Sequence, residues 1–299
     1  MQKKYFMAHK AGFVSIIGNP NVGKSTLMNS LVGEKLSIIT SKAQTTRHRI
    51  MGIINGEDFQ MIYSDTPGIL TPAYKMQKAM MSFVETALED SDVILYMAEA
   101  GETNLREDIA EKIKTSGNPY IIVINKIDKA DEPTLEQTND YFTSLFPGAE
   151  LFFISALHKI NITSVFKRLL EFLPESPAYF PKDQLTDKSE RFFITEILRE
   201  KILMNYHKEV PYSVEVVVDS FKEEEDIIRI MAIIYCSRES QKAIILGHKG
   251  NAIKKTASEA RADMEAFLQK HVYLELTVKV SKDWRDSDLQ LKRFGYFTE

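Results

Sequence analysis

The sequence predicts an α/β protein with a larger first domain, built on a mostly parallel sheet, and a smaller α+β domain after it. Short apolar runs recur through the first half of the chain and alternate with stretches of helical character, which is typical of crossover units that join parallel strands. After residue 190 the spacing changes, because two strand-like segments then follow each other directly. A length of 299 residues suits two domains that each bury their own core.

Five apolar runs mark the expected strands of the first domain, at residues 13–17, 59–63, 93–97, 120–124 and 151–154. One connection is too short for a crossover helix. Residues 47–54 and 59–63 flank the turn Asn55-Gly56-Glu57-Asp58, which suits a hairpin and predicts one antiparallel strand. Since the functional loops of such sheets gather at the carboxyl ends of the parallel strands, the residues that follow each run are the first candidates for a site.

The second domain is expected to run helix, strand, strand, helix, helix, strand. Phe193, Ile197 and Leu198 have helical spacing, and residues 214–218 and 227–235 have the composition of strands. The remaining elements are two helices and an alternating strand, at residues 238–246, 251–270 and 272–280.

The boundary between the domains is placed in a polar stretch that contains Pro174, Pro177 and Pro181. We expect a flexible N-terminus at residues 1–10, a first domain at 11–175, a linker at 176–190 and a second domain with a C-terminal tail at 191–299. The tail holds Trp284, the only tryptophan, for which packing against the last strand is a more frequent role than stacking on a base.

The composition excludes several classes of protein. Hydrophobic residues make up 44% and charged residues 27% of the chain, the balance of a soluble globular protein. Cys236 is the only cysteine, so we expect a packed core thiol, no internal disulfide and no cysteine-rich metal site. The sequence contains no apolar run of membrane-spanning length and no secretory signal. The expected compartment is the cytoplasm, and peripheral membrane contact stays open.

A phosphate-binding loop of the P-loop NTPase type follows the first apolar run and opens a helix. Its residues are Gly18-Asn19-Pro20-Asn21-Val22-Gly23-Lys24-Ser25. Glycines let the backbone approach phosphate oxygens, and the amides at the helix N-terminus favour negative charge. Lys24 adds a cation, and Ser25 would bind Mg²⁺. The candidate contacts are Gly18, Asn19, Asn21, Val22, Gly23, Lys24, Ser25 and Thr26. The alternative is a glycine-rich turn without a ligand.

A second motif, Asp65-Thr66-Pro67-Gly68, ends the next parallel strand. There the Asp65 carboxylate can reach the metal shell, and the Gly68 amide can meet a γ-phosphate. The alternative for this motif alone is an ordinary Pro-Gly turn, which is common. Its order after the phosphate-binding loop favours the nucleotide site.

A third motif, Asn125-Lys126-Ile127-Asp128, follows the run at residues 120–124. It is the candidate for recognising the base of the nucleotide. Guanine offers two N–H donors that one carboxylate accepts together, and adenine lacks that pair, so Asp128 favours GTP over ATP. Asn125 would hold the neighbouring loop, and Lys126 would lie along the base. A further candidate is the loop Ser155-Ala156-Leu157, which would supply a backbone N–H to guanine O6.

Together these motifs resemble the translation-factor-like GTPases, and Gln44-Thr45-Thr46-Arg47-His48 narrows the resemblance to the Era group. The resemblance covers nearly the whole chain. It implies that residues 38–50 form the first switch and that Thr45 or Thr46 closes over Mg²⁺ when the γ-phosphate is present; we favour Thr46. Without the resemblance, the two threonines indicate only β-propensity.

The expected reaction is hydrolysis of GTP to GDP and phosphate, with Lys24, Thr46 and Gly68 as the catalytic candidates and Ser25, Thr46 and Asp65 as the metal candidates. GTP or GDP and Mg²⁺ are the expected ligands. The residue after Gly68 is Ile69, where Ras-like enzymes have a water-orienting glutamine. We therefore expect slow intrinsic hydrolysis that an RNA or ribosomal partner raises.

The order of elements in the second domain resembles the type II KH domain, whose signature loop would be Gly247-His248-Lys249-Gly250. Such a loop clamps a nucleic-acid backbone between two helices. Residues 238–261 contain six basic and two acidic residues, a local charge of +4 in a chain of net charge −4. The candidate RNA contacts are Gly247, His248, Lys249, Gly250 and Lys254. We expect Ile244, Ile245 and Ile253 to pack beside the loop, and the alternative is a helix-helix turn with a solvated basic face.

The resemblance implies a molecular switch that binds 16S rRNA near its 3′ end and assists assembly of the small (30S) ribosomal subunit and rRNA maturation. It also implies a monomer and links the family to the inner face of the cell membrane. One alternative is a static RNA-binding module in which GTP is a structural ligand. Another is a metabolic ATPase or kinase, which Asp128 disfavours.

Overall fold

The structure, a computed structural model, describes residues 9–297, so most of the expected flexible N-terminus lies outside the described residues. Contacts divide the chain into two units. The first comprises Met1–Ser37, Thr46–Leu70 and Met80–Asp187, and the second comprises Ile38–Thr45, Thr71–Ala79 and Lys188–Glu299.

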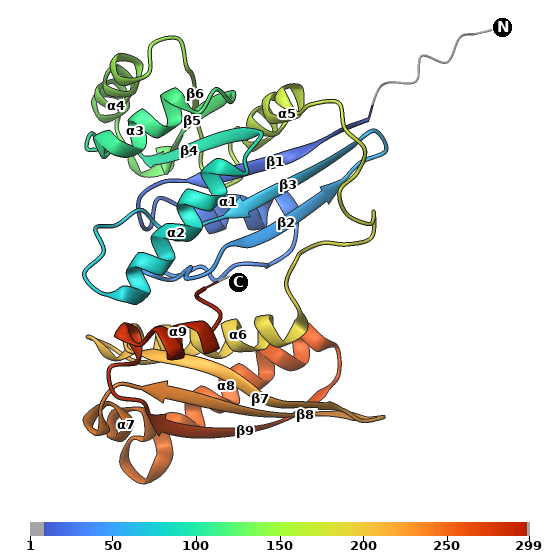
Figure 1. The fold of residues 1–299 in the computed structure, drawn as a ribbon, viewed down its shortest axis with the longest axis vertical. Coiled ribbons are helices and arrows are strands. Elements are labelled where there is room, and N and C mark those ends of the chain that lie inside the picture. The colour runs from blue at the N-terminus through green and yellow to red at the C-terminus, as the bar shows by residue number, and fades with distance from the viewer. Residues whose placement is uncertain (1–8, 298–299) are drawn as a thin grey trace, which may run out of the picture. The chain divides into compact units, whose positions relative to one another are not determined.

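A six-stranded sheet forms the centre of the first unit, in the order β2-β3-β1-β4-β5-β6 (Figure 1). The strands are β1 (Lys10–Ile17), β2 (Ile50–Asn55), β3 (Phe59–Asp65), β4 (Val93–Glu99), β5 (Tyr120–Asn125) and β6 (Glu150–Phe153). The pair β2–β3 is antiparallel and the other pairs are parallel. The predicted sheet with one antiparallel strand is therefore confirmed.

The antiparallel strand begins later than the sequence predicts, at Ile50 rather than at residue 47. Ile50 pairs with Asp65, the last residue of β3. Residues 47–49 lie beyond the end of β3, so they have no neighbouring strand to pair with. Tertiary pairing, and not the β-propensity of the segment, decides where this strand starts.

Helices alternate with the strands of the first unit, as the apolar spacing predicts. They are α1 (Lys24–Val32), α2 (Lys75–Glu89), which belongs to this unit from Met80 onward, α3 (Glu107–Thr115), α4 (Glu132–Leu145) and α5 (Ile162–Phe172). β4 is buried at all but its last position, which is typical of a central parallel strand that is covered on both faces. One core cluster joins Ile17, Ile94 and Ile122 to Phe142 and Phe146. The apolar runs therefore form the buried sheet from whose strand ends the candidate nucleotide loops extend.

The segment expected as a linker is bonded to the first unit. Gln60 of β3 is 0% exposed, and its Oε1 accepts hydrogen bonds from the amides of Tyr179 (2.7 Å) and Phe180 (2.9 Å). Its Nε2 donates to the Phe180 carbonyl at 2.8 Å and to Asn55 Oδ1 at 2.7 Å. The side chain of Gln60 thus binds the backbone of residues 179 and 180 and holds in place the segment that follows α5.

Further along, the same segment pairs with β2, the edge strand of the sheet. The Ile53 amide donates to the Leu185 carbonyl at 2.8 Å, and Thr186 Oγ1 donates to the Met51 carbonyl at 2.7 Å. The Met51 amide donates to Asp187 Oδ1 at 2.9 Å. These bonds cover an edge that would otherwise present unpaired backbone groups.

The second unit contains a three-stranded sheet in the order β7-β8-β9, antiparallel between the first two strands and parallel between the last two. The elements are α6 (Glu190–Asn205), β7 (Val214–Glu223), β8 (Ile227–Cys236), α7 (Glu239–Leu246), α8 (Asn251–Leu268) and β9 (His271–Val280). The predicted order is confirmed. The helix α8 ends two residues earlier than predicted, since Gln269 adopts left-handed geometry (φ 52°).

The tail of the second unit adds the short helix α9 (Asp288–Arg293). Trp284 is fully buried and donates from Nε1 to the Ser213 carbonyl at 3.0 Å, so it packs inside the unit. Cys236 is also fully buried, which raises the pKa of its thiol, and the prediction of a core thiol is confirmed.

Candidate functional site

The phosphate-binding loop connects β1 to α1, and close packing requires its glycines. A Cβ added to Gly18 would lie 2.0 Å from the Met97 carbonyl oxygen. Gly23 has a φ of 106°, and a Cβ there would lie 2.3 Å from Asn125 Nδ2. Asn21 also adopts a left-handed conformation (φ 65°), and Lys24, Ser25 and Thr26 begin α1. The loop is therefore shaped by contacts with two neighbouring strands.

Lys24 is buried at the start of α1, and its Nζ donates to the carbonyls of Gly18 (3.0 Å) and Asn19 (2.9 Å). Burial lowers the pKa of Lys24 to about 8, and the negative charges of Asp65 and Glu102 oppose that shift. The amine therefore lies within the loop that would receive a phosphate, and its pKa is lower than that of an exposed lysine side chain.

This pKa predicts that GDP affinity falls as the pH rises above about 8. Above this pH the amine of ligand-free Lys24 loses its proton. In the complex, the negative charge of the phosphate would keep the amine protonated, so GDP binding takes up one proton in this pH range. The affinity should fall by up to tenfold per pH unit. Calorimetry in buffers of different ionisation enthalpy counts the protons. Lys24→Arg, which does not titrate in this range, should lose the pH dependence; an unchanged slope in that variant would contradict the prediction.

Ser25, Thr46 and Asp65 bring their side-chain oxygens together. Ser25 Oγ donates to Asp65 Oδ2 at 2.7 Å and lies 3.0 Å from Thr46 Oγ1. Thr46 Oγ1 is 3.4 Å from Asp65 Oδ2. The Thr45 hydroxyl instead donates to the Lys42 carbonyl at 2.5 Å and contacts the Thr40 hydroxyl. Of the two threonines, Thr46 is the one that the structure brings to the metal candidates.

These three residues fit Mg²⁺. Asp65 Oδ1 is buried without a hydrogen-bond partner, and burial raises the pKa of this carboxyl against the opposing hydrogen bond from Ser25. A buried carboxylate oxygen beside two hydroxyls is the type of donor set that a hard cation binds. Among residues 9–297, no group of three or more His, Cys, Asp and Glu side chains is placed to hold a metal.

Gly68 lies against the phosphate-binding loop, because a Cβ on it would be 2.6 Å from the Cα of Pro20. The amide of the next residue, Ile69, donates to the Gly18 carbonyl at 3.1 Å. The Ile69 side chain is buried in the core cluster that contains Ile17 and Val84. Position 69 therefore contributes its backbone to the loop and its side chain to the core.

We expect Ile69→Gln to lower the free energy of unfolding by about 2 kcal/mol, because the new amide would be buried among apolar groups. Basal GTP hydrolysis should not become faster, since a side chain at this position packs in the core, although the missing glutamine was the reason to expect slow hydrolysis. Chemical denaturation and phosphate release measure the two effects, and Ile69→Leu is the volume-matched control. Fast hydrolysis by Ile69→Gln would show that a glutamine at this position does orient the attacking water.

The loops expected to hold guanine are joined by Asn125, which is buried at the end of β5. Its Nδ2 donates to the Val22 carbonyl at 2.7 Å, and its Oδ1 accepts from the Ala156 amide at 2.9 Å. One side chain thus connects the phosphate-binding loop to the loop Ser155-Ala156-Leu157. Leu157 itself is 67% exposed.

Asp128 lies beside the same loop. A hydrogen bond from the Ser155 hydroxyl lowers the pKa of the Asp128 carboxyl, so the group is ionised at neutral pH and can accept two N–H donors. His158 Nε2 is 3.7 Å from Asp128 Oδ2. Lys126 Nζ forms an ion pair with Glu99 Oε2 at 2.6 Å. Glu99 and His158 were not predicted from the sequence; Glu99 could have been found, because it ends β4 at the carboxyl edge of the sheet.

The candidate RNA loop lies between α7 and α8. Gly247 (φ 68°) and Gly250 (φ 77°) have positive φ, and so has Lys249 (φ 50°). A Cβ on Gly247 would lie 2.6 Å from the Cβ of Ala252, so the loop packs tightly on the start of α8. His248, Lys249 and Lys254 are exposed. The basic side chains therefore face solvent around a compact turn.

One expectation about this loop is wrong. Ile245 is fully buried and Ile253 packs against the core, but Ile244 is 51% exposed. Neighbouring residues of a helix point about 100° apart, and the rotation of α7 turns Ile245 toward the core and Ile244 toward solvent. Ile244 is instead an apolar side chain at the surface of α7.

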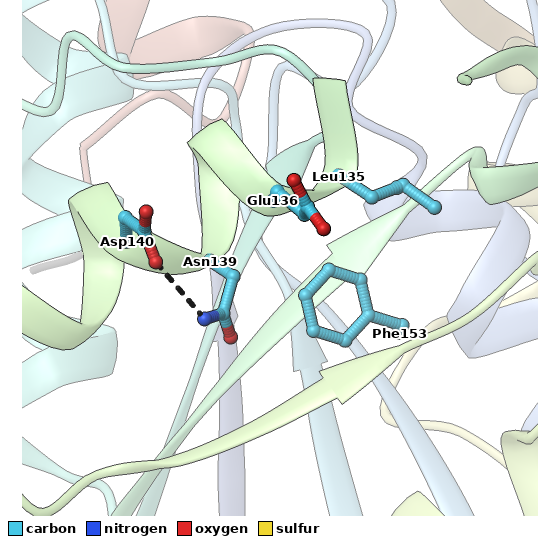
Figure 2. Close-up of a pocket in the computed structure, with 5 residues that line it drawn as sticks. All are labelled: Leu135, Glu136, Asn139, Asp140 and Phe153. Carbon is cyan, nitrogen blue, oxygen red and sulfur yellow. Dashed lines mark hydrogen bonds between the residues drawn. The ribbon is translucent and has the colours of Figure 1, made fainter. Parts of the chain in front are cut away.

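A separate open pocket of about 450 Å³ lies between α4 and β6. Figure 2 shows Phe153 of β6 facing Leu135, Glu136, Asn139 and Asp140 of α4. None of the residues expected to bind nucleotide or RNA lines this pocket, which is thus distinct from both candidate sites.

The two units match different families. Residues 13–126 match the 50S ribosome-binding GTPase family, and residues 209–285 match the KH domain family. With the phosphate-binding loop, the guanine-type loop and the glycine-containing turn in place, the class is a P-loop GTPase joined to a KH domain.

Comparison with known relatives identifies the family within this class. The chain is 48% identical to GTPase Era of Syntrophus aciditrophicus over 96% of this chain and 95% of the relative. It is 44% identical to GTPase Era of Clostridium kluyveri over 96% and 99%. The chain belongs to the GTPase Era family.

Solved structures agree with that assignment. A variant of Aquifex aeolicus Era bound to GDP·AlF4⁻ aligns with a TM-score of 0.92 and 40% identity over 97% of this chain and 100% of that one. Era in complex with MgGDPNP and nucleotides 1506–1542 of 16S ribosomal RNA aligns equally well, at 39% identity over 97% and 100%. Among the helices of residues 9–297, none has both the length and the apolar character needed to cross a bilayer.

Proposed function

We propose that this chain is a GTP-hydrolysing molecular switch that binds 16S rRNA near its 3′ end and assists small-subunit assembly and rRNA maturation. The observation that carries the proposal is that one chain combines a phosphate-binding loop and a guanine-type loop, joined by Asn125, with a KH-type loop that has exposed basic residues. The likeness to an Era structure that holds both MgGDPNP and 16S rRNA supports it.

In the proposed nucleotide site, different residues would contact the phosphates, the base and the metal ion. Lys24 and the first amides of α1 would neutralise phosphate charge, and the Asp128 carboxylate would accept the two N–H groups of guanine. Ser25, Thr46 and Asp65 would hold Mg²⁺. When bound, Mg²⁺ neutralises charge that develops on the β- and γ-phosphates. The Gly68 amide would contact the γ-phosphate, because Gly68 packs against the loop at Pro20.

Thr46 gives the proposed switch its sensitivity to the nucleotide. The hydroxyl of Thr46 lies with Ser25 and Asp65, and β2 begins four residues later at Ile50. Loss of the γ-phosphate would release Thr46 and loosen the segment that leads into β2. We infer that this change alters how the KH domain is presented to RNA.

The proposed setting is the cytoplasm, with the 30S subunit as partner. A monomeric state and peripheral contact with the inner face of the cell membrane stay predictions of the family resemblance.

RNA binding tests this function. We expect a labelled RNA from the 3′ end of 16S rRNA to bind the wild type more tightly with a GTP analogue than with GDP. Lys249→Asp should weaken binding by about tenfold or more and lower the salt dependence, because it removes a phosphate contact. Lys222→Asp, the same charge change on an exposed residue of β7, is the matched control.

Equal affinity with GDP and with the GTP analogue would instead favour a static RNA-binding module in which GTP is structural. If Lys249→Asp and Lys222→Asp bound RNA equally well, the KH loop would not be the RNA site.

A further inference from the structure

A short turn after β4 contacts both nucleotide loops, although no nucleotide motif includes it. The turn runs from Glu99 to Glu102 and is closed by a hydrogen bond from the Glu102 amide to the Glu99 carbonyl at 2.9 Å. The Ala100 amide donates to the Asn125 carbonyl at 2.9 Å, and the Gly101 amide donates to Thr138 Oγ1 at 2.8 Å. The turn is thus fixed to the end of β5 and to α4.

The carboxylate of Glu102 points from this turn to the phosphate-binding loop. Its Oε1 accepts from Asn19 Nδ2 at 2.8 Å and from the Tyr96 hydroxyl at 3.3 Å, and its Oε2 accepts from the Glu99 amide at 3.3 Å. The side chain is half-buried, and burial raises the pKa of Glu102 while these hydrogen bonds oppose the shift. A carboxylate in such a place costs free energy unless its bonds are satisfied.

Asn19 is thereby held from two directions. Its side chain donates to Glu102, and its carbonyl accepts from Lys24 Nζ at 2.9 Å. Asn19 lies between Gly18 and Lys24, in the part of the loop that would surround the phosphates. Glu102 also lies close enough to Lys24 for its charge to favour the protonated amine.

Glu99 reaches the base loop from the same turn through its ion pair with Lys126. Both side chains of that pair are partly exposed to solvent, and such pairs contribute little free energy. The bond from Glu102 to Asn19 is the connection that reaches the phosphate-binding loop.

We propose that Glu102 is a positioning residue for the phosphate-binding loop and acts through Asn19. The inference rests on the proposed nucleotide pocket. Glu102 bonds to Asn19 of the phosphate-binding loop, which a diphosphate and a triphosphate would both contact, so Glu102 supports the two kinds of nucleotide equally. Its loss raises KM for GTP and weakens GDP binding, and it leaves kcat unchanged.

A double-mutant cycle on GDP affinity in the full chain tests the proposal. Glu102→Ala and Asn19→Ala each weaken GDP binding about tenfold, and the double variant also weakens it about tenfold, because all three remove the same interaction. Glu102→Gln keeps an acceptor for Asn19 and stays within about threefold of the wild type. Glu111→Ala, which removes an exposed carboxylate from α3, is the matched control, and Glu99→Ala has an effect below about threefold.

Three results would overturn the proposal: wild-type GDP affinity in Glu102→Ala, a hundredfold loss in the double variant, or a fall in kcat at constant KM. Lys24→Ala separates this inference from the pocket assignment. If Lys24→Ala also bound GDP like the wild type, the pocket itself would be misplaced. If only Lys24→Ala lost affinity, the role of Glu102 alone would be wrong.

An exchange of the two side chains covers the case in which Glu102→Ala does not fold. Asn19→Asp alone sets two carboxylates against each other and weakens GDP binding. Adding Glu102→Gln restores an amide-carboxylate pair in the opposite order and recovers affinity to within about threefold of the wild type. A double variant no better than Asn19→Asp would overturn the proposal.

Discussion

Asp128→Asn is expected to lower GTP affinity at least about a hundredfold and to create binding of xanthosine triphosphate. The Asp128 carboxylate is held by the Ser155 hydroxyl and would accept both N–H donors of guanine. An asparagine keeps one acceptor and places an NH₂ donor against the second guanine donor. Xanthine has a carbonyl at that position, so the amide can accept from one group and donate to the other.

Competition against a fluorescent guanine nucleotide measures both affinities. Asp131→Asn is the matched control, because Asp131 lies three residues further on and caps α4 by accepting from the Thr134 amide, which an asparagine can also do. Loss of GTP binding without a gain for xanthosine triphosphate would mean that the loop had collapsed. Unchanged GTP affinity would remove Asp128 from the base site.

Gln60→Ala is expected to lower the free energy of unfolding of the first unit by about 3 kcal/mol. The change leaves the amides of Tyr179 and Phe180 and the Phe180 carbonyl without their side-chain partner. Residues 176–187 should then become sensitive to proteases, because their attachment to β3 is lost. Gln137→Ala, an exposed glutamine on α4, is the matched control.

Circular dichroism during denaturation and fragment mapping after limited proteolysis measure these effects. Trp284, the only tryptophan, is buried in the second unit, so its fluorescence reports that unit separately and should not change. An unaltered stability with no new cleavage between residues 176 and 187 would show that the bonds to Gln60 contribute little. A lowered stability of the second unit as well would point to general misfolding.

The local pattern of the sequence determined the fold class of both units. Alternating apolar runs predicted the parallel sheet, because strands buried on both faces must be apolar throughout. The hairpin turn at Asn55-Gly56-Glu57-Asp58 predicted the antiparallel strand for a similar local reason. The candidate nucleotide loops were also predicted from the sequence, since their chemistry depends on short runs of residues that directly follow a strand.

Only the tertiary structure decided which threonine approaches the metal candidates, because Thr45 and Thr46 are neighbours of the same type and differ in what surrounds them. The same holds for Ile244 and Ile245, where the rotation of one short helix buries one side chain and exposes the other. Contacts between distant segments could not be predicted from the sequence either. Gln60 bonds to residues about 120 positions away, and Glu102 bonds to Asn19 across 83 positions. No local pattern encodes such a pair, since it arises when the sheet brings the ends of its strands together.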